Sequence, residues 1–135
     1  MHENEFTSCG SCAQRWATRV DFLADPSLRV VDYRANVQKL ESGLVTFVHR
    51  TETCGATMAI PIGRFFDLYT GPRYTKNMSL TDACPRYCFN KTEFRSCKNQ
   101  CSCAVARETT AIVMCCLDTA RRRAIVTGEA AMGER

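Results

Sequence analysis

Apolar side chains recur at helical spacing near the start of the chain. Within residues 13–23 they fall at i, i+3, i+4, i+7 and i+10, which is one face of a helix: Ala13, Trp16, Ala17, Val20 and Leu23. Asp25-Pro26 would end this helix, because the residue before a proline avoids helical backbone. Cys9 and Cys12 directly precede the stripe. We therefore expect a C-x2-C pair at a helix N-terminus, where the helix dipole stabilises thiolates.

Three short segments carry the β-branched and aromatic residues that are typical of strands. They are residues 28–33, 44–49 and 56–60. Residues 36–43 predict a loop with one helical turn, and Gly55 can supply a positive φ in the connection before the third strand. Residues 63–69 predict a short helix that ends at Gly71-Pro72. The pattern indicates an α+β fold with a small antiparallel three-stranded sheet and an N-terminal helix.

A polar linker over residues 73–80 suggests two parts. Residues 1–72 would form a zinc-ribbon-like α+β part, and residues 73–135 would form a cysteine-rich helical module. Ser79 or Thr81 can cap a helix that carries Cys84 and Cys88 one turn apart. Such a module would make the C-terminal half mainly helical.

Two further segments of this module follow the cysteines. Residues 92–95 can begin a second helical piece that carries Cys97 and Cys101. From Ala104 onward the apolar positions fit a helical stripe, although the β-branched residues of 109–117 would also suit a strand. Residues from Val126 to the end predict a frayed tail.

Cysteine content changes this otherwise ordinary globular picture. The chain has ten cysteines in 135 residues. No basic start with an apolar run of signal-peptide type is visible, and no apolar segment approaches the roughly 20 residues of a membrane span. We therefore expect a cytoplasmic protein with reduced thiols, in which clustered cysteines serve metal or redox chemistry.

One candidate metal site combines two distant pairs of residues. Cys9 and Cys12 form a C-x2-C pair, and His49 and Cys54 form an H-x4-C pair. Three thiolates and one imidazole are a common ligand set of tetrahedral structural zinc. The arrangement resembles the knuckles of zinc-ribbon and treble-clef fingers, although the second knuckle is His-x4-Cys rather than Cys-x2-Cys. The alternative is a surface histidine with unrelated thiols.

The Cys9–Cys12 pair has a competing redox interpretation. Thioredoxin-like enzymes place C-x-x-C after a buried strand in a βαβ frame, but only eight residues precede Cys9 here. Enzyme motifs such as a nucleophile elbow, a phosphate-binding loop or H-E-x-x-H are missing from the sequence. A Cys54–His49 nucleophile pair would lack an orienting third group. We expect a protein without catalytic activity.

A second candidate site is the densest cysteine run, spaced C-x3-C-x8-C-x3-C-x-C. Cys84, Cys88, Cys97 and Cys101 can close a second tetrahedral zinc site, with Cys103 as a substitute ligand. An iron–sulfur cluster is an alternative, although the C-x2-C-x2-C run of ferredoxins is missing. The paired C-x3-C motifs also resemble the twin C-x3-C proteins of the mitochondrial intermembrane space. That resemblance implies a helical hairpin with two disulfides.

The remaining features give weaker signals. Cys115 and Cys116 lie in an apolar run and predict thiols buried in the core. Residues 73–98 carry six Lys/Arg against two Asp/Glu, a balance of +4 that equals the net charge of the whole chain. Nucleic-acid binding through this segment is therefore a third functional hypothesis.

Several motifs together suggest a resemblance. From Cys9 to about Arg107 the order is CxxC, tryptophan, two strands, HxxxxCG, GRFxDLYxGP, CPxYC and CxxxCxC. This order resembles uncharacterised small cysteine-rich bacterial proteins, which implies a shared scaffold and no activity. The main hypothesis is a metal-stabilised binding or adaptor protein with structural zinc and a protein partner. The alternative is a redox or electron-transfer protein with an iron–sulfur centre or reactive dithiols.

Overall fold

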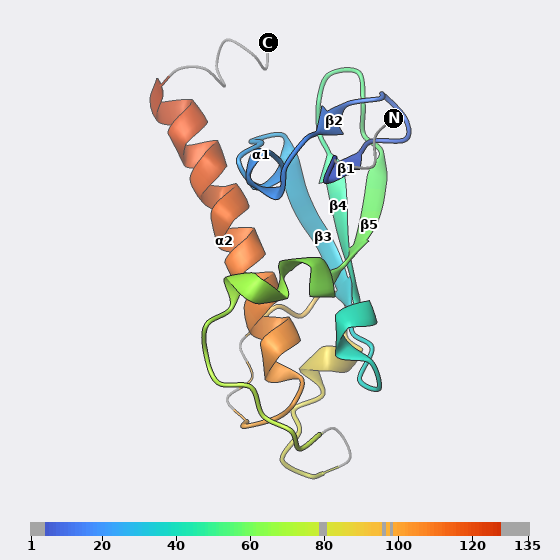
Figure 1. The fold of residues 1–135 in the computed structure, drawn as a ribbon, viewed down its shortest axis with the longest axis vertical. Coiled ribbons are helices and arrows are strands. Elements are labelled where there is room, and N and C mark those ends of the chain that lie inside the picture. Colours follow the sequence, from blue (N-terminus) through green and yellow to red (C-terminus); the bar gives the residue numbers. More distant parts are fainter. Residues whose placement is uncertain (1–4, 79–80, 96, 98, 128–135) are drawn as a thin grey trace. The chain divides into compact units, whose positions relative to one another are not determined.

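The fold is α+β and contains two small sheets and one long helix (Figure 1). In the computed structural model, residues 5–78, 81–95, 97 and 99–127 are described. The strands and α-helices are β1 Thr7–Ser8, β2 Arg15–Trp16, α1 Arg19–Leu23, β3 Leu28–Arg34, β4 Leu44–His49, β5 Thr57–Pro61 and α2 Ala104–Thr127. The 3-10 helices are η1 Leu40–Ser42, η2 Ile62–Leu68 and η3 Tyr87–Phe89.

Chain contacts divide the described residues into two compact units. The first unit contains residues up to 29, residues 47–58 and residues from 114. The second unit contains residues 30–46 and 59–113. The sequence-based boundary between residues 72 and 73 stays a prediction.

The predicted N-terminal helix over residues 13–23 is wrong in its first half. β1 and β2 form an antiparallel hairpin in which Thr7 pairs with Trp16. Helix α1 has only five residues and begins after Thr18, whose hydroxyl accepts a hydrogen bond from the Asp21 amide at 3.0 Å. The C-x2-C pair therefore lies in a hairpin turn and not at a helix N-terminus. Trp16 is buried all the same, because a short strand can bury this side chain as well as a helix can.

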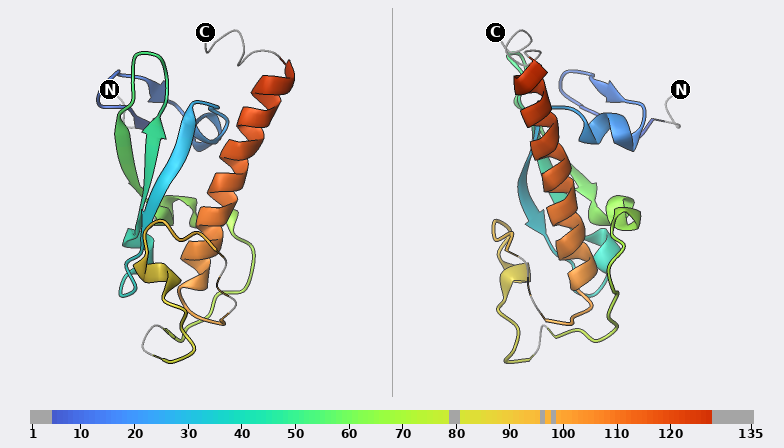
Figure 2. Two further views of the ribbon diagram at one scale, coloured as in Figure 1. Left: turned by 180° about the vertical axis from the view of Figure 1, so that it is seen from behind. Right: turned by 90° about the vertical axis from the view of Figure 1, so that its left-hand side faces the viewer.

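The predicted three-stranded antiparallel sheet is confirmed. Its strand order is β3-β4-β5, and Figures 1 and 2 show the three strands lying side by side. Side chains alternate along β4, so that Val45, Phe47 and His49 are buried while Leu44 is exposed. This alternation turns His49, the last residue of β4, toward the inner face.

Aromatic rings build the core of the first unit. Phe22 of α1 lies edge-on to Phe47 of β4, with ring centroids 4.9 Å apart, and edge-on to Trp16 at 5.1 Å. The indole nitrogen of Trp16 donates to the carboxylate of Asp25 at 2.9 Å, and Asp25 also accepts from the Ser27 amide and hydroxyl. The polar tip of a buried ring is thereby satisfied.

The core of the second unit depends on close contact between η1 and η2. A β-carbon added at Gly63 of η2 would lie 2.6 Å from the Glu41 β-carbon and 2.9 Å from the Glu41 carbonyl oxygen. Only glycine allows this approach. Ile62 and Phe65 of η2 are fully buried beside it. The predicted short helix over 63–69 is thus confirmed as the 3-10 helix η2, and the predicted turn in 36–43 as η1.

The cysteine segment of the second unit is mostly irregular, which corrects the predicted helical module. Its described part contains only the single turn η3, and residues 92–95 form no helix. Arg86 has a φ of 68°, a left-handed conformation that a helix from Thr81 through Cys88 could not contain. Ser79, the other predicted cap, lies outside the described residues.

Residues 104–127 form helix α2, so the segment 109–117, for which the sequence allowed either helix or strand, is helical. Helix α2 has 24 residues and runs through Thr127, so the predicted tail does not begin at Val126. Its N-terminal part is buried nearly all round, and the hydroxyls of Thr109 and Thr110 donate to the carbonyls of Val105 and Ala106. Residues 128–135 lie outside the described residues.

Candidate metal centre

The candidate metal centre of the first unit lies where two hairpins meet. Cys9 and Cys12 belong to the turn between β1 and β2, while His49 ends β4 and Cys54 lies in the β4–β5 connection. All four ligand atoms lie within 4.8 Å of one another. The sequence-based pairing of these four residues is therefore confirmed as a possible metal site.

The first hairpin turn is shaped by the backbone around Cys9. The Cys9 amide donates to the Gln14 carbonyl at 2.7 Å, and the Ala13 amide donates back to the Cys9 carbonyl at 3.0 Å. Ala13 has a φ of 66°, in the left-handed region that a side chain disfavours. This strained residue directly follows Cys12 and returns the chain into β2. Local strain of this kind often accompanies functional sites.

The second turn is held by reciprocal hydrogen bonds. The amides of Thr51 and Cys54 donate to each other's carbonyls at 3.2 and 3.4 Å, and the His49 amide donates to the Ala56 carbonyl at 2.9 Å. The Ala56 amide also points at the Cys54 sulfur at 3.5 Å. Gly55 does not adopt a positive φ, so that expectation is wrong, and the left-handed residue of the site is Ala13 instead.

Two of the six distances between ligand atoms match those of a tetrahedral zinc site. The sulfurs of Cys9 and Cys54 lie 3.7 Å apart, and the Cys12 sulfur lies 3.4 Å from the His49 Nδ1 atom. With zinc–sulfur bonds of about 2.3 Å and zinc–nitrogen bonds of about 2.0 Å, tetrahedral geometry predicts about 3.8 Å between two sulfurs and about 3.5 Å between sulfur and nitrogen. These two pairs thus have the spacing that one zinc ion requires, and all four ligand atoms lie within 4.8 Å of one another.

Thiolate formation at this site is uneven. The pKa of Cys9 is lowered to about 6, chiefly because the amides of Cys12 and Ser11 donate to its sulfur and outweigh the effect of burial. At Cys12 the Gln14 amide lowers the pKa, but desolvation and the two neighbouring thiols outweigh it and raise the pKa on balance. Three adjacent sulfurs therefore do not all become anionic without a cation among them.

His49 is fixed by its aromatic neighbour. It is only 3% exposed, and its ring lies edge-on to the Trp16 ring with centroids 5.2 Å apart. Trp16 in turn packs on Phe22, which places the ligand in direct continuity with the core of the first unit. Sequence reasoning assigned Trp16 to the core, which is confirmed, but its contact with the ligand is visible only in the fold.

The five cysteines of the second candidate site line one pocket of the second unit. The Cys88 pKa is lowered to about 6, first by a hydrogen bond from Cys103 and also by Arg107, while the Cys103 pKa is raised by the same hydrogen bond and by burial. Among the described residues, Cys9, Cys12, His49 and Cys54 form the one group whose ligand atoms could hold a single metal ion. A second tetrahedral site stays a prediction.

Cys115 and Cys116 are not the core thiols that the sequence predicted. Cys115 is exposed and Cys116 is half-buried. The buried positions of this half of α2 are Leu117, Ala120 and Ala124, which follow helical spacing and leave Cys115 on the outer side.

Comparison with protein-family models, curated proteins and solved structures finds no match to this chain. The resemblance to small cysteine-rich bacterial proteins therefore rests on the motifs alone, and the structure supports its coarser part, a small module with a Cys3His cluster. Within the described residues, none of the helices combines the length and apolar character that a transmembrane span needs.

Proposed function

We propose that Cys9, Cys12, His49 and Cys54 bind one structural zinc ion. The observation that carries this proposal is the mutual spacing of the four ligand atoms, all within 4.8 Å. The Cys9–Cys12 pair and the His49–Cys54 pair come from separate hairpins and still lie at this spacing. Imidazole and thiolate are ligands that zinc prefers. Four protein ligands complete a tetrahedral shell, so no position remains for substrate or water.

A zinc ion here would link segments that are far apart in the chain. Cys9 and Cys54 are 45 residues apart, and Cys12 and His49 are 37 apart. The β1–β2 hairpin has only two residues in each strand, and a two-stranded ribbon of this size is not stable alone. Coordination would anchor it to the end of β4. In such small metal sites the binding free energy becomes folding free energy.

We further propose that the protein is a binding or adaptor protein without catalytic activity. A closed metal shell serves structure, so the protein would act through its surface, and the partner we propose is another protein. Some large apolar side chains are exposed on that surface, at 74% for Val20, 56% for Phe89 and 69% for Ile125. Because the site needs reduced thiols, we place the protein in a reducing compartment such as the cytoplasm.

A dithiol oxidoreductase receives less support from the same site. In such enzymes the exposed cysteine is the attacking thiolate and has the lowered pKa. Here the lowered pKa belongs to Cys9, which is 2% exposed, whereas the exposed Cys12 has a raised pKa. The order of exposure and acidity is the reverse of what attack on a disulfide requires.

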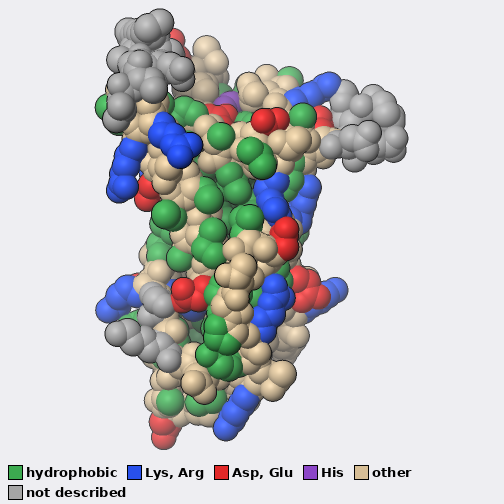
Figure 3. All heavy atoms as spheres, turned by 60° about the vertical axis from the view of Figure 1, so that its left-hand side comes forward, with side chains coloured by type: hydrophobic (Ala, Val, Ile, Leu, Met, Phe, Trp, Pro, Cys, Tyr) green, Lys and Arg blue, Asp and Glu red, His purple; other side chains and the backbone are tan. Residues whose placement is uncertain are grey.

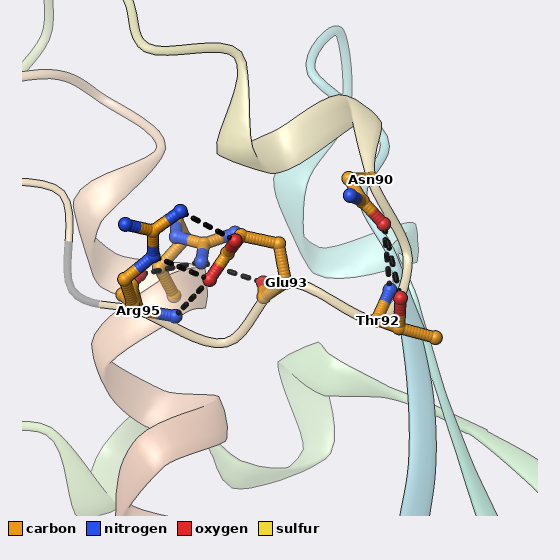
Figure 4. Close-up of polar contacts among 5 residues, drawn as sticks. Asn90, Thr92, Glu93 and Arg95 are labelled. Atoms are coloured by element: carbon orange, nitrogen blue, oxygen red, sulfur yellow. Dashed lines mark hydrogen bonds and ion pairs between the residues drawn. The ribbon is translucent and has the colours of Figure 1, made fainter.

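Nucleic-acid binding through residues 73–98 also receives less support. The Arg95 guanidinium is engaged by the Glu93 carboxylate at 2.9 Å (Figure 4), and Arg73 donates to the Phe66 carbonyl at 3.1 Å. On the face shown in Figure 3, Lys and Arg side chains are interspersed with Asp and Glu side chains. A phosphate-binding surface would instead gather its free cations in one patch.

Zinc stoichiometry tests the proposal. The Cys54→Ser variant should contain one zinc equivalent fewer than wild type by elemental mass spectrometry, while the matched Cys115→Ser variant, which alters an exposed thiol of α2, should retain the wild-type content. Cobalt substitution adds a second readout, because the intensity of the thiolate-to-cobalt charge-transfer band reports the number of thiolate ligands, here three. Equal zinc contents in the two variants would exclude the site.

A further inference from the structure

The second unit contains a pocket whose chemistry the structural zinc site does not explain. Its lining combines five thiols with one buried guanidinium: Cys84, Cys88, Cys97, Cys101, Cys103 and Arg107. Cys101 and Cys103 are buried, and the other three thiols are half-buried. Sulfur atoms therefore face the same space from segments that span twenty residues of the chain.

Backbone amides point at the sulfurs of this pocket. The Met78 amide donates to the Cys101 sulfur at 3.1 Å, and the Cys103 amide approaches the same sulfur at 3.5 Å. The Arg86 amide donates to the Cys84 sulfur at 3.4 Å. In the last two cases the donor is two residues after the cysteine, as it is for Cys54 in the zinc site. Such amide–sulfur bonds stabilise thiolates and not thiols.

The pocket also faces the positive end of the longest helix. Cys103 directly precedes α2, and its carbonyl accepts the amide of Arg107 at 3.2 Å, so Cys103 is the N-cap residue of the helix. Free amides and the dipole at this end favour negative charge. The helix therefore adds to the stabilisation of anionic sulfur at Cys101 and Cys103.

Arg107 is the observation that points independently to an anionic occupant. It is only 6% exposed, and its Nε atom is buried without a hydrogen-bond partner. Its Nη2 atom donates to both the Glu93 and the Arg95 carbonyl, at 2.8 and 2.6 Å, and its Nη1 atom donates to the Cys88 sulfur at 4.0 Å. These contacts bring no compensating carboxylate to the guanidinium.

The Glu93 carboxylate attracts Arg107 through space, but its hydrogen bonds are with another cation. Glu93 forms two hydrogen bonds of 2.9 Å with the Arg95 side chain, and Asn90 fixes the preceding turn through the Thr92 amide and hydroxyl (Figure 4). The carbonyls of Glu93 and Arg95 thus accept hydrogen bonds from Arg107, whereas the Glu93 carboxylate accepts its hydrogen bonds from Arg95. The guanidinium also lies 5.5 Å from the centre of the Tyr87 ring, and negative charge on the thiols would further offset its buried charge. Several thiolates in one pocket in turn require a metal cation, because they repel one another.

The spacing of the thiols distinguishes one ion from several. Among the described residues, the thiols of this pocket do not form a group that could hold a single metal ion, in contrast to the zinc site. A single zinc ion would hold its sulfurs about 3.8 Å apart. An iron–sulfur cluster uses four cysteine thiolates but attaches them to different iron ions, which separates them more widely. We propose that this pocket binds an iron–sulfur cluster through four of its five thiolates, with Arg107 offsetting the negative charge.

Anaerobic reconstitution tests the proposal on the full chain. The protein is treated with ferric iron, sulfide and a thiol reductant, and iron, acid-labile sulfide and zinc are then counted per chain. We expect a brown protein with iron and labile sulfide in comparable amounts and an electron paramagnetic resonance signal after reduction. A protein that takes up zinc in the pocket and no labile sulfide would overturn the proposal. Pairwise disulfides among these cysteines in the protein purified without oxygen would do the same.

Variants then locate the cluster. Cys84→Ser and Cys97→Ser alter half-buried thiols, so at least one should fold like wild type by circular dichroism and yet lose most of the labile sulfide. Cys115→Ser should keep it. Cys54→Ser separates the two centres, since it should lose zinc and retain the cluster. Loss of labile sulfide in Cys54→Ser with retention in both pocket variants would place the cluster in the first unit and refute this assignment.

Discussion

Cys12 is the exposed ligand of the proposed zinc site, and its replacement by serine separates metal binding from packing. Because the Cys12 side chain is exposed, Cys12→Ser should change the stability of the metal-free protein by no more than about 0.5 kcal/mol. The same change removes one of four ligand atoms. Any larger loss must therefore come from the metal.

The size of that loss follows from the ligand count. Structural zinc binds with about 10–16 kcal/mol, so an even share per ligand is about 2.5–4 kcal/mol, or roughly a hundredfold to thousandfold in affinity. At free zinc a thousandfold above the wild-type Kd, zinc adds about 4 kcal/mol to the wild-type free energy of unfolding. For Cys12→Ser the same zinc concentration should add only about 0.4–1.4 kcal/mol.

Urea unfolding under reducing conditions measures both quantities. The single tryptophan, Trp16, reports directly, since its ring lies against His49. Wild type and Cys12→Ser are compared with a chelator and in zinc-buffered solution, with Cys115→Ser as the control that should respond like wild type. If wild type unfolds at the same urea concentration with and without zinc, or if Cys12→Ser keeps the full zinc response, the assignment of this site is wrong.

Three further predictions concern the fold around the sites. Gly63→Ala should destabilise the protein by about 1–3 kcal/mol, because the new β-carbon would lie 2.9 Å from the backbone of η1. The control Gly10→Ala has free space around its new β-carbon, and chemical denaturation of both variants measures the difference. Asp25→Ala should cost about 1–3 kcal/mol by leaving the buried Trp16 indole N–H unpaired, and thermal unfolding that matches wild type would contradict the role of this bond. Burial first, and then the nearby thiols, raise the pKa of Tyr33 above its ordinary value of 10.0. The folded protein binds this proton more tightly, so the contribution of Tyr33 to stability is present below pH 10 and declines above it; Tyr33→Phe should flatten the alkaline decline, and an identical decline in the variant would refute this.

The sequence predicted strongly patterned elements well and locally determined turns poorly. The strand over 44–49 matches β4 residue for residue, because β-branched and aromatic side chains alternate there. The helix expected over 13–23 failed because the hairpin turn at Cys9–Gln14 redirects a chain that carries helical spacing. The structure buries Trp16 and Leu23 of that apolar stripe but leaves Val20 74% exposed, so helical spacing alone did not show which of these side chains reach the core.

The candidate metal ligands could be predicted from the sequence, but the backbone and the buried charge around the cysteines could not. The C-x2-C and H-x4-C spacings identified Cys9, Cys12, His49 and Cys54, because together they supply three thiols and one imidazole, a common ligand set of zinc. The sequence suggested that Gly55 could supply a positive φ, but the left-handed residue of the site is Ala13. A β-carbon disfavours left-handed backbone without forbidding it. Arg107 could not be connected with the cysteine pocket at all, because its role depends on its burial at the start of α2.

The four ligands of the zinc site differ sharply in their access to water. Cys9 and His49 are 2% and 3% exposed, whereas Cys12 is open to solvent. Cys54 is half-buried, so an incoming chelator or peroxide molecule would reach Cys12 most readily, and the bond from Cys12 to the ion would be the first to exchange. The residence time of the proposed zinc ion would then be controlled chiefly at the Cys12 sulfur, however tightly Cys9 and His49 hold the ion.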